Sequence, residues 1–163
     1  MALHFTLLDT RRHDRNGFSC GEPTLDTYLR EQAGQHQRDG IATTHVLIDD
    51  ADAARILGYC SLAAAQMNLL DLQPADRKRL PVYPVPAVRI GRLAVSRDVQ
   101  GSGYGRLLLG HAVNGSMQLR HQLGVRVLLV DALHDRAAAF YRGYGFRATA
   151  TRHPRTLYLP LGK

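Results

Sequence analysis

The chain of 163 residues is poor in cysteine and lacks long apolar runs. Its two cysteines, Cys20 and Cys60, are expected to be free thiols, because such low usage is typical of reducing compartments. No apolar stretch approaches the roughly 20 residues that a membrane span needs. The N-terminal segment lacks the basic and then apolar layout of a secretory signal. The sequence therefore predicts a cytoplasmic protein that does not enter a membrane.

Acidic residues are also scarce, with 14 Asp and Glu against 21 Lys and Arg, which gives a formal net charge of +7. Arginine supplies most of the excess, and its planar guanidinium binds phosphates in pairs of hydrogen bonds. A polyanion such as nucleic acid is therefore a candidate partner. The eight histidines lack ligand spacing with cysteine or acidic residues, so no structural metal is expected. No Ser-His-Asp or Cys-His relay is evident, and nothing in the sequence indicates a covalent enzyme intermediate.

Hydrophobic periodicity predicts an alternation of strands and helices in a single domain over residues 1–163. Strands are predicted at residues 3–9, 43–49, 56–62, 88–96, 125–131, 146–151 and 156–161, and helices at residues 23–37, 103–123 and 134–143. The first three strands suit an antiparallel meander, and residues 88–131 suit a right-handed β-α-β unit with a parallel strand pair. Residues 70–86 contain four prolines and are expected to form a surface loop, which either faces a substrate or only connects two strands.

The stretch from Val88 to Arg106 carries the strongest local signal. A buried strand is followed by Gln100-Gly-Ser-Gly-Tyr-Gly105 and then at once by an apolar helix. Unpaired N–H groups and the dipole make a helix N-terminus attractive to anions, and glycines let a phosphate approach the backbone closely. This pattern predicts a site for a pyrophosphate.

Two motifs carry a resemblance to a known family. Gln100-Gly-Ser-Gly-Tyr-Gly105 matches a Q/R-x-x-G-x-G/A turn, and Phe140-Tyr-Arg-Gly-Tyr-Gly-Phe146 matches an F-Y-x-x-x-G-F motif one β-α unit later. With both in order, residues 1–161 resemble a GNAT-fold acyl-CoA N-acetyltransferase. The resemblance implies an α+β fold. Its mixed, mostly antiparallel sheet would have six to seven strands, with a central parallel pair splayed into a V, flanked by about four helices.

Several shorter matches make the chain similar to the toxin branch of that family, the TacT-like and AtaT-like tRNA acetyltransferases of type II toxin–antitoxin pairs. They include Phe18-x-Cys20-Gly21, Leu25-Asp-x-Tyr-Leu29 and Val130-Asp-Ala132. This resemblance implies acetyl transfer from acetyl-CoA to the α-amino group of aminoacyl-tRNA, which blocks translation. It also implies a homodimer and a ribbon-helix-helix antitoxin whose tail covers the active site.

The resemblance places acetyl-CoA on the glycine turn and the preceding strand. The cofactor-binding residues are then Leu93, Ala94, Val95, Gln100, Gly101, Ser102, Gly103, Tyr104, Gly105, Arg106 and Phe140. Tyr141 is the candidate general acid, because the leaving thiolate needs a proton and the phenol can supply it. Tyr144 is a weaker rival for this role.

Glutamate is nearly absent, and the two that occur, Glu22 and Glu31, lie on or near the first predicted helix. No glutamate therefore stands out as a general base. An α-amine with a pKa near 8 needs less help to lose its proton than a lysine near 10.4, so the sequence suits a weakly basic amine better. Asp131, His134 and water remain candidates for the proton acceptor.

Basic residues cluster before and after the glycine turn. The candidate contacts with tRNA are Arg77, Lys78, Arg79, Arg89, Arg92, Arg142 and Arg147. Arg89 and Arg92 are three positions apart, so at most one of them is expected to face a substrate. A solvated basic face is the alternative explanation. Two other functions stay open, namely acetylation of a protein N-terminus or small amine, and a non-catalytic module that binds CoA or nucleic acid.

Overall fold

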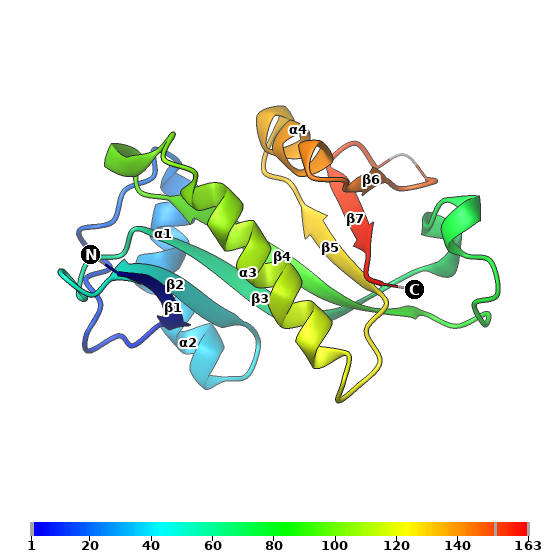
Figure 1. Ribbon diagram of the computed structural model, residues 1–163, viewed down its shortest axis with the longest axis horizontal. Helices are drawn as coiled ribbons and strands as arrows, with labels where there is room; N and C mark the ends of the chain where they lie inside the picture. The colour runs from blue at the N-terminus through cyan, green and yellow to red at the C-terminus, as the bar shows by residue number, and fades with distance from the viewer. Residues whose placement is uncertain (1, 152, 163) are drawn as a thin grey trace. The chain divides into compact units, whose positions relative to one another are not determined.

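The computed structural model describes residues 2–151 and 153–162. The α-helices are α1 (Pro23–Glu31), α2 (Ala33–Arg38), α3 (Tyr104–Leu119) and α4 (Asp135–Gly143). The strands are β1 (Leu3–Leu7), β2 (Thr43–Asp49), β3 (Gly58–Met67), β4 (Val85–Val95), β5 (Val127–Asp131), β6 (Arg147–Ala148) and β7 (Thr156–Pro160) (Figure 1). They form a seven-stranded mixed sheet in the order β1-β2-β3-β4-β5-β7-β6. The mixed seven-stranded sheet with a parallel pair and four α-helices confirms the fold class expected from the sequence.

The chain divides into two compact units, residues 1–63 with 91–112 and residues 64–90 with 113–163. Strands β3 and β4 and helix α3 each contribute to both units. No helix in the described part of the chain is long and apolar enough to span a membrane.

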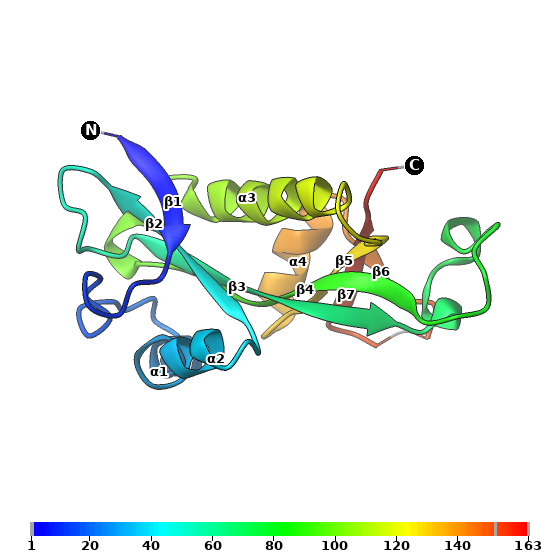
Figure 2. The ribbon, with the colours of Figure 1, turned by 90° about the horizontal axis from the view of Figure 1, so that it is seen from below.

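The first unit begins with an antiparallel meander. Strand β1 pairs with β2, and β2 pairs with β3, both antiparallel, which confirms the prediction. Helices α1 and α2 lie on one face of these strands and the first part of α3 lies on the other (Figure 2). The core is built from the inward residues of all these elements, among them Tyr28, Leu29, Val46, Ile48, Tyr59, Ala94 and Leu108.

The helix predicted over residues 23–37 is two helices, because the backbone leaves the helical conformation at Gln32. Pro23 occupies the first turn of α1, as expected, and Tyr28 and Leu29 form its buried face. In α2, a Cβ on Gly34 would lie 2.9 Å from Thr10 Cγ2. The short second helix therefore packs so closely against the loop after β1 that a side chain at residue 34 would be crowded. The bend at Gln32 accompanies this close packing.

Gly58 is a second point of close packing in the first unit. A Cβ there would lie 2.8 Å from Leu108 Cδ1 and 2.9 Å from the Ala94 carbonyl oxygen. Only glycine fits, so the start of β3 lies close to the end of β4 and to the first turns of α3. Cys20 and Cys60 are buried in the same unit as free thiols, as the sequence predicts.

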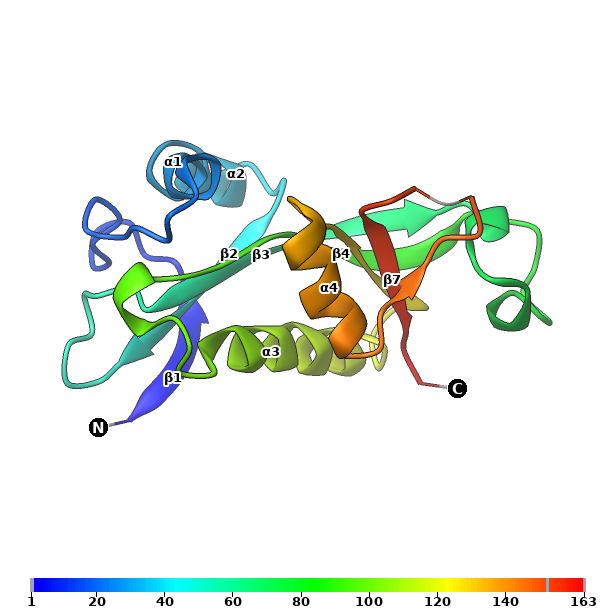
Figure 3. The same ribbon diagram turned by 90° about the horizontal axis from the view of Figure 1, so that it is seen from above.

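The second unit contains the parallel strand pair. Residues 87–90 of β4 pair with residues 127–130 of β5, and the last pair is Ile90 with Val130. Strand β5 also pairs with β7, and β7 with β6, both antiparallel. Helix α4 lies beside β7 (Figure 3). The core of this unit includes Met67, Leu72, Val85, Val127, Leu129 and Tyr158.

The strand predicted over residues 146–151 is reduced to Arg147–Ala148. The Thr149 hydroxyl accepts a hydrogen bond from the His153 N–H, and the Ala150 N–H donates to the Asp71 carbonyl. These bonds turn the backbone away from β7, so the pairing of β6 with β7 ends at Ala148. Helix α3 ends at Leu119 and not at residue 123, because the chain turns away there through bonds such as Gln122 N–H to Leu119 O.

Residues 68–84, called here the 68–84 loop, join β3 to β4 through two short 3-10 turns, Leu69–Asp71 and Pro74–Asp76. This is the segment that the sequence predicts as a surface loop over residues 70–86. Leu72 is fully buried, and the Tyr158 hydroxyl accepts a bond from the Gln73 N–H at 2.7 Å and donates to Asp76 at 2.6 Å. The base of the loop is therefore fixed to the sheet.

Candidate functional site

The glycine turn follows β4 in the first unit. A 3-10 turn at Arg97–Val99 leads into it, and α3 begins at Tyr104. Gly101 and Gly103 have φ values of +86° and +85°, a region that other L-residues rarely adopt, and no atom lies within 4 Å of a Cβ on either. The backbone conformation therefore requires both glycines, and the outer side of the turn is open.

The N-terminus of α3 is suited to an anion. The Leu107 N–H donates to the Gly103 carbonyl at 3.2 Å, so the N–H groups of Tyr104, Gly105 and Arg106 precede the first helical hydrogen bond. The first turn of α3 contains no acidic residue, and the Arg106 side chain is exposed. Three unused donors, the positive end of the dipole and one arginine thus meet at an open turn.

Gln100 supports the turn from inside. Its side-chain amide donates to the Cys20 carbonyl at 2.8 Å and to the Val95 carbonyl at 3.0 Å. The Tyr104 ring packs against the cluster around Leu108, so this residue offers a ligand its backbone. Ser102 is exposed on the same turn. Of the predicted cofactor residues, Gln100 and Tyr104 therefore use their side chains to hold the turn.

Leu93, Ala94 and Val95 lie at the end of β4, beyond the last residue that pairs with β5. Ala94 is buried, and the side chains of Leu93 and Val95 pack against the cluster around Leu108. These contacts fix the backbone of this segment.

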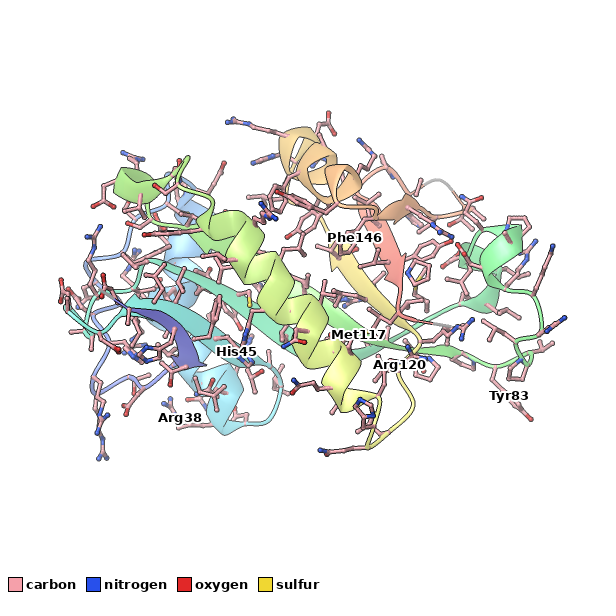
Figure 4. The ribbon with its side chains drawn as sticks, viewed as in Figure 1. Arg38, His45, Tyr83, Met117, Arg120 and Phe146 are labelled. Carbon is pink, nitrogen blue, oxygen red and sulfur yellow. The ribbon has the colours of Figure 1, made fainter. Side chains whose placement is uncertain are left out.

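Tyr141 lies near the end of α4 in the second unit and is 5% exposed. Its ring makes edge contacts with Phe140 and Phe146, each with ring centroids 5.3 Å apart. Figure 4 shows Phe146 beneath α4, between the helix and the strands of its unit. Tyr144, the weaker rival, is 45% exposed and touches only the Phe140 ring among described aromatic residues. The two tyrosines therefore differ in how firmly their rings are held.

The residues considered as bases have structural partners. His134 is the N-cap of α4, and its Nδ1 accepts a hydrogen bond from the Ala137 N–H at 3.1 Å. Asp131 accepts a bond from the Thr156 hydroxyl at 2.8 Å and lies 3.7 Å from Arg89 Nε. Both side chains therefore have structural roles at the ends of their elements.

The predicted tRNA contacts fall into two groups. Arg89 pairs with Asp131, Arg147 pairs with Asp76, and Arg92 lies 3.7 Å above the Tyr28 ring, so each of these three has a partner within the described chain. The side chains of Lys78, Arg79 and Arg142 are exposed, and Arg77 is partly buried. For none of these four is an ion pair found within the described chain. The sequence did not predict these intramolecular partners, and the role of all seven residues in binding tRNA stays a prediction.

Charge is divided unevenly between the two units. Twelve of the 21 Lys and Arg residues and only four of the 14 Asp and Glu residues belong to the second unit. The first unit has slightly more acidic than basic residues. The whole positive excess of the protein therefore belongs to the second unit.

Two polar arrangements escaped prediction. One is the set of Asp76, Arg147 and Tyr158 at the base of the 68–84 loop. The other is a pair of histidines in the first unit, where His111 Nε2 lies 2.9 Å from His45 Nδ1 and the His111 ring stacks on Phe5 at 4.1 Å. Residues so far apart in sequence give no periodic signal, so only the fold reveals them.

Comparison with known proteins identifies the family to which this fold and these motifs belong. A family model described as "Acetyltransferase (GNAT) domain" matches residues 40–148. The chain belongs to the GNAT acetyltransferases. No cluster of three or more metal-ligating side chains is found in the part of the chain that the structure describes.

Within this family the chain is similar to toxins. A tRNA-acetylating toxin of Mycobacterium tuberculosis is 38% identical over 138 residues, covering 85% of this chain and 81% of that protein. A tyrosine-to-phenylalanine mutant of KacT superposes with a TM-score of 0.92 at 29% identity, covering 99% of this chain and 96% of KacT.

AtaT is the third similar protein. Its complex with acetyl-methionyl-tRNAfMet gives a TM-score of 0.91 at 28% identity, covering 98% of this chain and 95% of AtaT. The AtaTR structure bound with AcCoA gives 0.85 at 29% identity, covering 98% and 94%.

Proposed function

We propose that the protein is the toxin of a type II toxin–antitoxin pair and acts in the cytoplasm. It transfers acetyl from acetyl-CoA to the α-amino group of aminoacyl-tRNA and so blocks translation. The observation that carries this proposal is the 38% identity, over 85% of the chain, to a tRNA-acetylating toxin. The complex of AtaT with acetyl-methionyl-tRNAfMet supports the same acceptor. The two compact units would together make one GNAT domain.

The glycine turn fits the pyrophosphate of acetyl-CoA. It is open, it presents the unused N–H groups of residues 104–106, and it lies on a helix whose first turn has no acid. Residues 93–95 lie beyond the part of β4 that pairs with β5, so their backbone is suited to align the pantetheine as an added strand would be. Acetyl-CoA supplies the activated acyl group as a thioester.

Tyr141 would be the general acid. The acceptor amine forms a bond to the thioester carbonyl carbon, the C–S bond breaks, and the phenol gives its proton to the departing sulfur. The phenolate then regains a proton, released by the amine, through water. A phenol and a thiol have pKa values near 10 and 8.5, so the transfer is close to balanced. An aminoacyl ester amine is largely neutral at cellular pH, so no dedicated glutamate base is needed.

An antitoxin would complete the system. The AtaTR complex with AcCoA and the antitoxin complexes of related toxins support a protein partner for this chain. The sequence resemblance implies a ribbon-helix-helix antitoxin whose tail covers the active site, and a homodimeric toxin. Co-expression with the product of an adjacent small reading frame should restore growth if the pair is complete.

Mass spectrometry of aminoacyl-tRNAs incubated with acetyl-CoA and the protein tests the proposal directly. We expect an added acetyl group on the α-amine, and about a hundredfold slower acetylation with the Tyr141→Phe variant. Expression of the wild type should arrest growth, and expression of the variant should not. If no aminoacyl-tRNA gains an acetyl group while a peptide N-terminus or a small amine does, the acceptor is not tRNA.

A further inference from the structure

The tip of the 68–84 loop has an unusual surface. Tyr83 is 72% exposed, and Figure 4 shows its ring extending away from the loop. Lys78 and Arg79 are exposed a few residues earlier. Arg79 is the one residue other than glycine with a positive φ, +65°, in the described chain, and it lies in a turn closed by the Leu80 N–H and the Arg77 carbonyl. A largely exposed aromatic ring and two exposed cations thus belong to the same short segment of the loop.

The tip projects from a rigid base. Tyr158 bonds both Gln73 and Asp76, and Asp76 also pairs with Arg147. The Gln73 side chain donates to the Ala148 carbonyl at 3.0 Å. Leu80, between the two cations and Tyr83, packs on the core of the second unit. These contacts anchor the loop at Gln73, Asp76 and Leu80, on both sides of the two cations and just before the exposed ring.

The charge of the second unit makes this tip a strong anion attractor. Three of the four acidic residues in the unit lie beside arginines: Asp76 pairs with Arg147, Asp131 lies 3.7 Å from Arg89, and Asp135 lies 3.5 Å from Arg155. For Lys78 and Arg79 no acidic partner is found in the described chain. The positive excess of the unit is thus left on side chains such as these.

We propose that the tip binds a single-stranded segment of RNA, with an unpaired base stacked on Tyr83 and adjacent phosphates on Lys78 and Arg79. The inference rests on the proposed function for the identity of the RNA, a tRNA. Exposed aromatic rings stack on bases of any sequence, and neighbouring cations follow the backbone. Double-stranded RNA keeps its bases inside the helix, so the ring selects an unpaired nucleotide. Tyr83 is then a positioning residue for the acceptor and takes no part in the chemistry.

RNA suits this surface better than a protein segment does. The charged residues of the tip, Arg77, Lys78 and Arg79, are all positive. Stacking with phosphate contacts uses the exposed ring and both exposed cations, whereas a protein partner would need acidic residues around an aromatic pocket. A protein on the tip is one outcome that the following experiment can detect.

The absence of tryptophan from the chain gives a direct probe. The Tyr83→Trp variant carries a single indole at the tip, and stacking on a base quenches its emission. We expect saturable quenching by a single-stranded oligocytidylate dodecamer and little quenching by a blunt RNA duplex of equal length. High salt should abolish the quenching by the single strand. The Ile41→Trp variant, with its indole at a 60% exposed position of the first unit, is the matched control and should not be quenched. Equal quenching by duplex and single strand would overturn the inference.

Affinity measurements on non-fluorescent variants complete the test. Tyr83→Ala should weaken binding of the labelled dodecamer, and raise KM for aminoacyl-tRNA, by about tenfold or more with little change in kcat. Tyr83→Phe should keep the wild-type affinity, and Val82→Ala, at the 88% exposed neighbour, should have no effect.

The outcomes separate this inference from the proposed function. If the wild type acetylates aminoacyl-tRNA but Tyr83→Ala has an unchanged KM, the inference fails and the function stands. If no tRNA is acetylated but the indole is quenched only by single strands, the function fails and the RNA surface stands. Unchanged RNA affinity in Tyr83→Ala, together with loss of neutralisation by the antitoxin, would place a protein on the tip and overturn the inference.

Discussion

The Tyr141 side chain is held by edge contacts with Phe140 and Phe146, so its hydroxyl has little freedom to move. Tyr141→Phe keeps the ring and removes the hydroxyl group, and with it the proton that the general acid would give. We expect kcat for acetyl transfer to fall by about a hundredfold, the usual scale for general acid–base catalysis, while the affinity for acetyl-CoA stays within twofold. Steady-state kinetics and calorimetric titration with acetyl-CoA measure the two effects.

Tyr144 provides the control for this prediction. It is on the same segment, is 45% exposed, and loses the same hydroxyl in Tyr144→Phe. That variant should retain kcat. A Tyr141→Phe enzyme with wild-type turnover, or a larger loss in Tyr144→Phe, would assign the proton to another group.

The His45–His111 pair makes stability depend on pH. Burial, and secondarily the charge of His111, lower the pKa of His45 to about 4, and burial lowers that of His111. Below pH 6.5 the unfolded chain therefore binds more protons than the folded protein. The stabilisation is complete above pH 6.5 and is lost as the pH falls toward 4.

We expect the free energy of unfolding to drop by about 1 kcal/mol between pH 7 and pH 5 from this pair, after allowance for partial solvent screening. Urea unfolding at both pH values measures the drop. Removing the exposed His121, as His121→Gln, should leave the profile unchanged, whereas His45→Gln should flatten it. Parallel profiles for wild type and His45→Gln would show that the pair does not govern the acid response.

The glycine turn and α3 act together as one element, and their glycines have different roles. Gly103 has a φ of +85°, so an added Cβ strains the backbone by about 1–2 kcal/mol although there is space for the atom itself. The turn relaxes by moving its N–H groups. We therefore expect Gly103→Ala to weaken acetyl-CoA binding by about tenfold, measured by calorimetric titration.

Gly110, in the exposed middle of α3, is the matched position. No atom lies within 4 Å of a Cβ there and its φ is ordinary. Gly110→Ala should raise stability by about 0.5–1 kcal/mol, because alanine has the higher helix propensity, and should leave acetyl-CoA binding unchanged. Equal affinities in the two variants would mean that the turn geometry does not matter for the ligand.

Most elements were predictable because their patterns are local. The strand before the glycine turn, the helix after it and the meander of β1–β3 follow from apolar periodicity and turn residues. The failures occur where tertiary contacts or local side-chain hydrogen bonds override the periodic pattern. Gln32 interrupts a periodic helix, and the Thr149 and Ala150 bonds end β6 early. Neither could be read from the periodic pattern.

The candidate site was predicted through its backbone more than its side chains. The glycines at residues 101 and 103 predict the turn, because its positive-φ backbone requires glycine and the sequence shows where glycines occur. The partners of Arg89, Arg92 and Arg147 depend on residues up to 71 positions away, so sequence alone could not tell an arginine that holds the fold from one that is open to a ligand.

For the whole molecule, the uneven charge predicts which cations govern the salt response. With the positive excess in the second unit, tRNA binding should weaken steeply as salt rises. We expect the combined Lys78→Ala and Arg79→Ala changes to reduce the slope of log Kd against log salt by about 1.5, since each phosphate contact contributes roughly 0.7–0.9.

Arg11 and Arg12 form the comparison. They are also adjacent and exposed, but they belong to the first unit. Replacing both by alanine changes the net charge equally and should leave the slope within error. Filter binding of tRNA at four salt concentrations resolves the difference. Equal slopes for both double variants would mean that net charge alone, and not its location, sets the affinity.

The two buried cysteines allow the opening of the first unit to be measured by chemical modification. Burial raises the pKa of both thiols to about 12, so neither Cys20 nor Cys60 is a thiolate in the folded protein at neutral pH. Alkylation by iodoacetamide then requires local opening of the surrounding chain. The alkylation rate therefore reports how often the chain opens. Because the second unit contains no cysteine, the alkylation rate reports on the first unit alone. Slower alkylation with acetyl-CoA present would measure how strongly ligand binding at the glycine turn holds that unit closed.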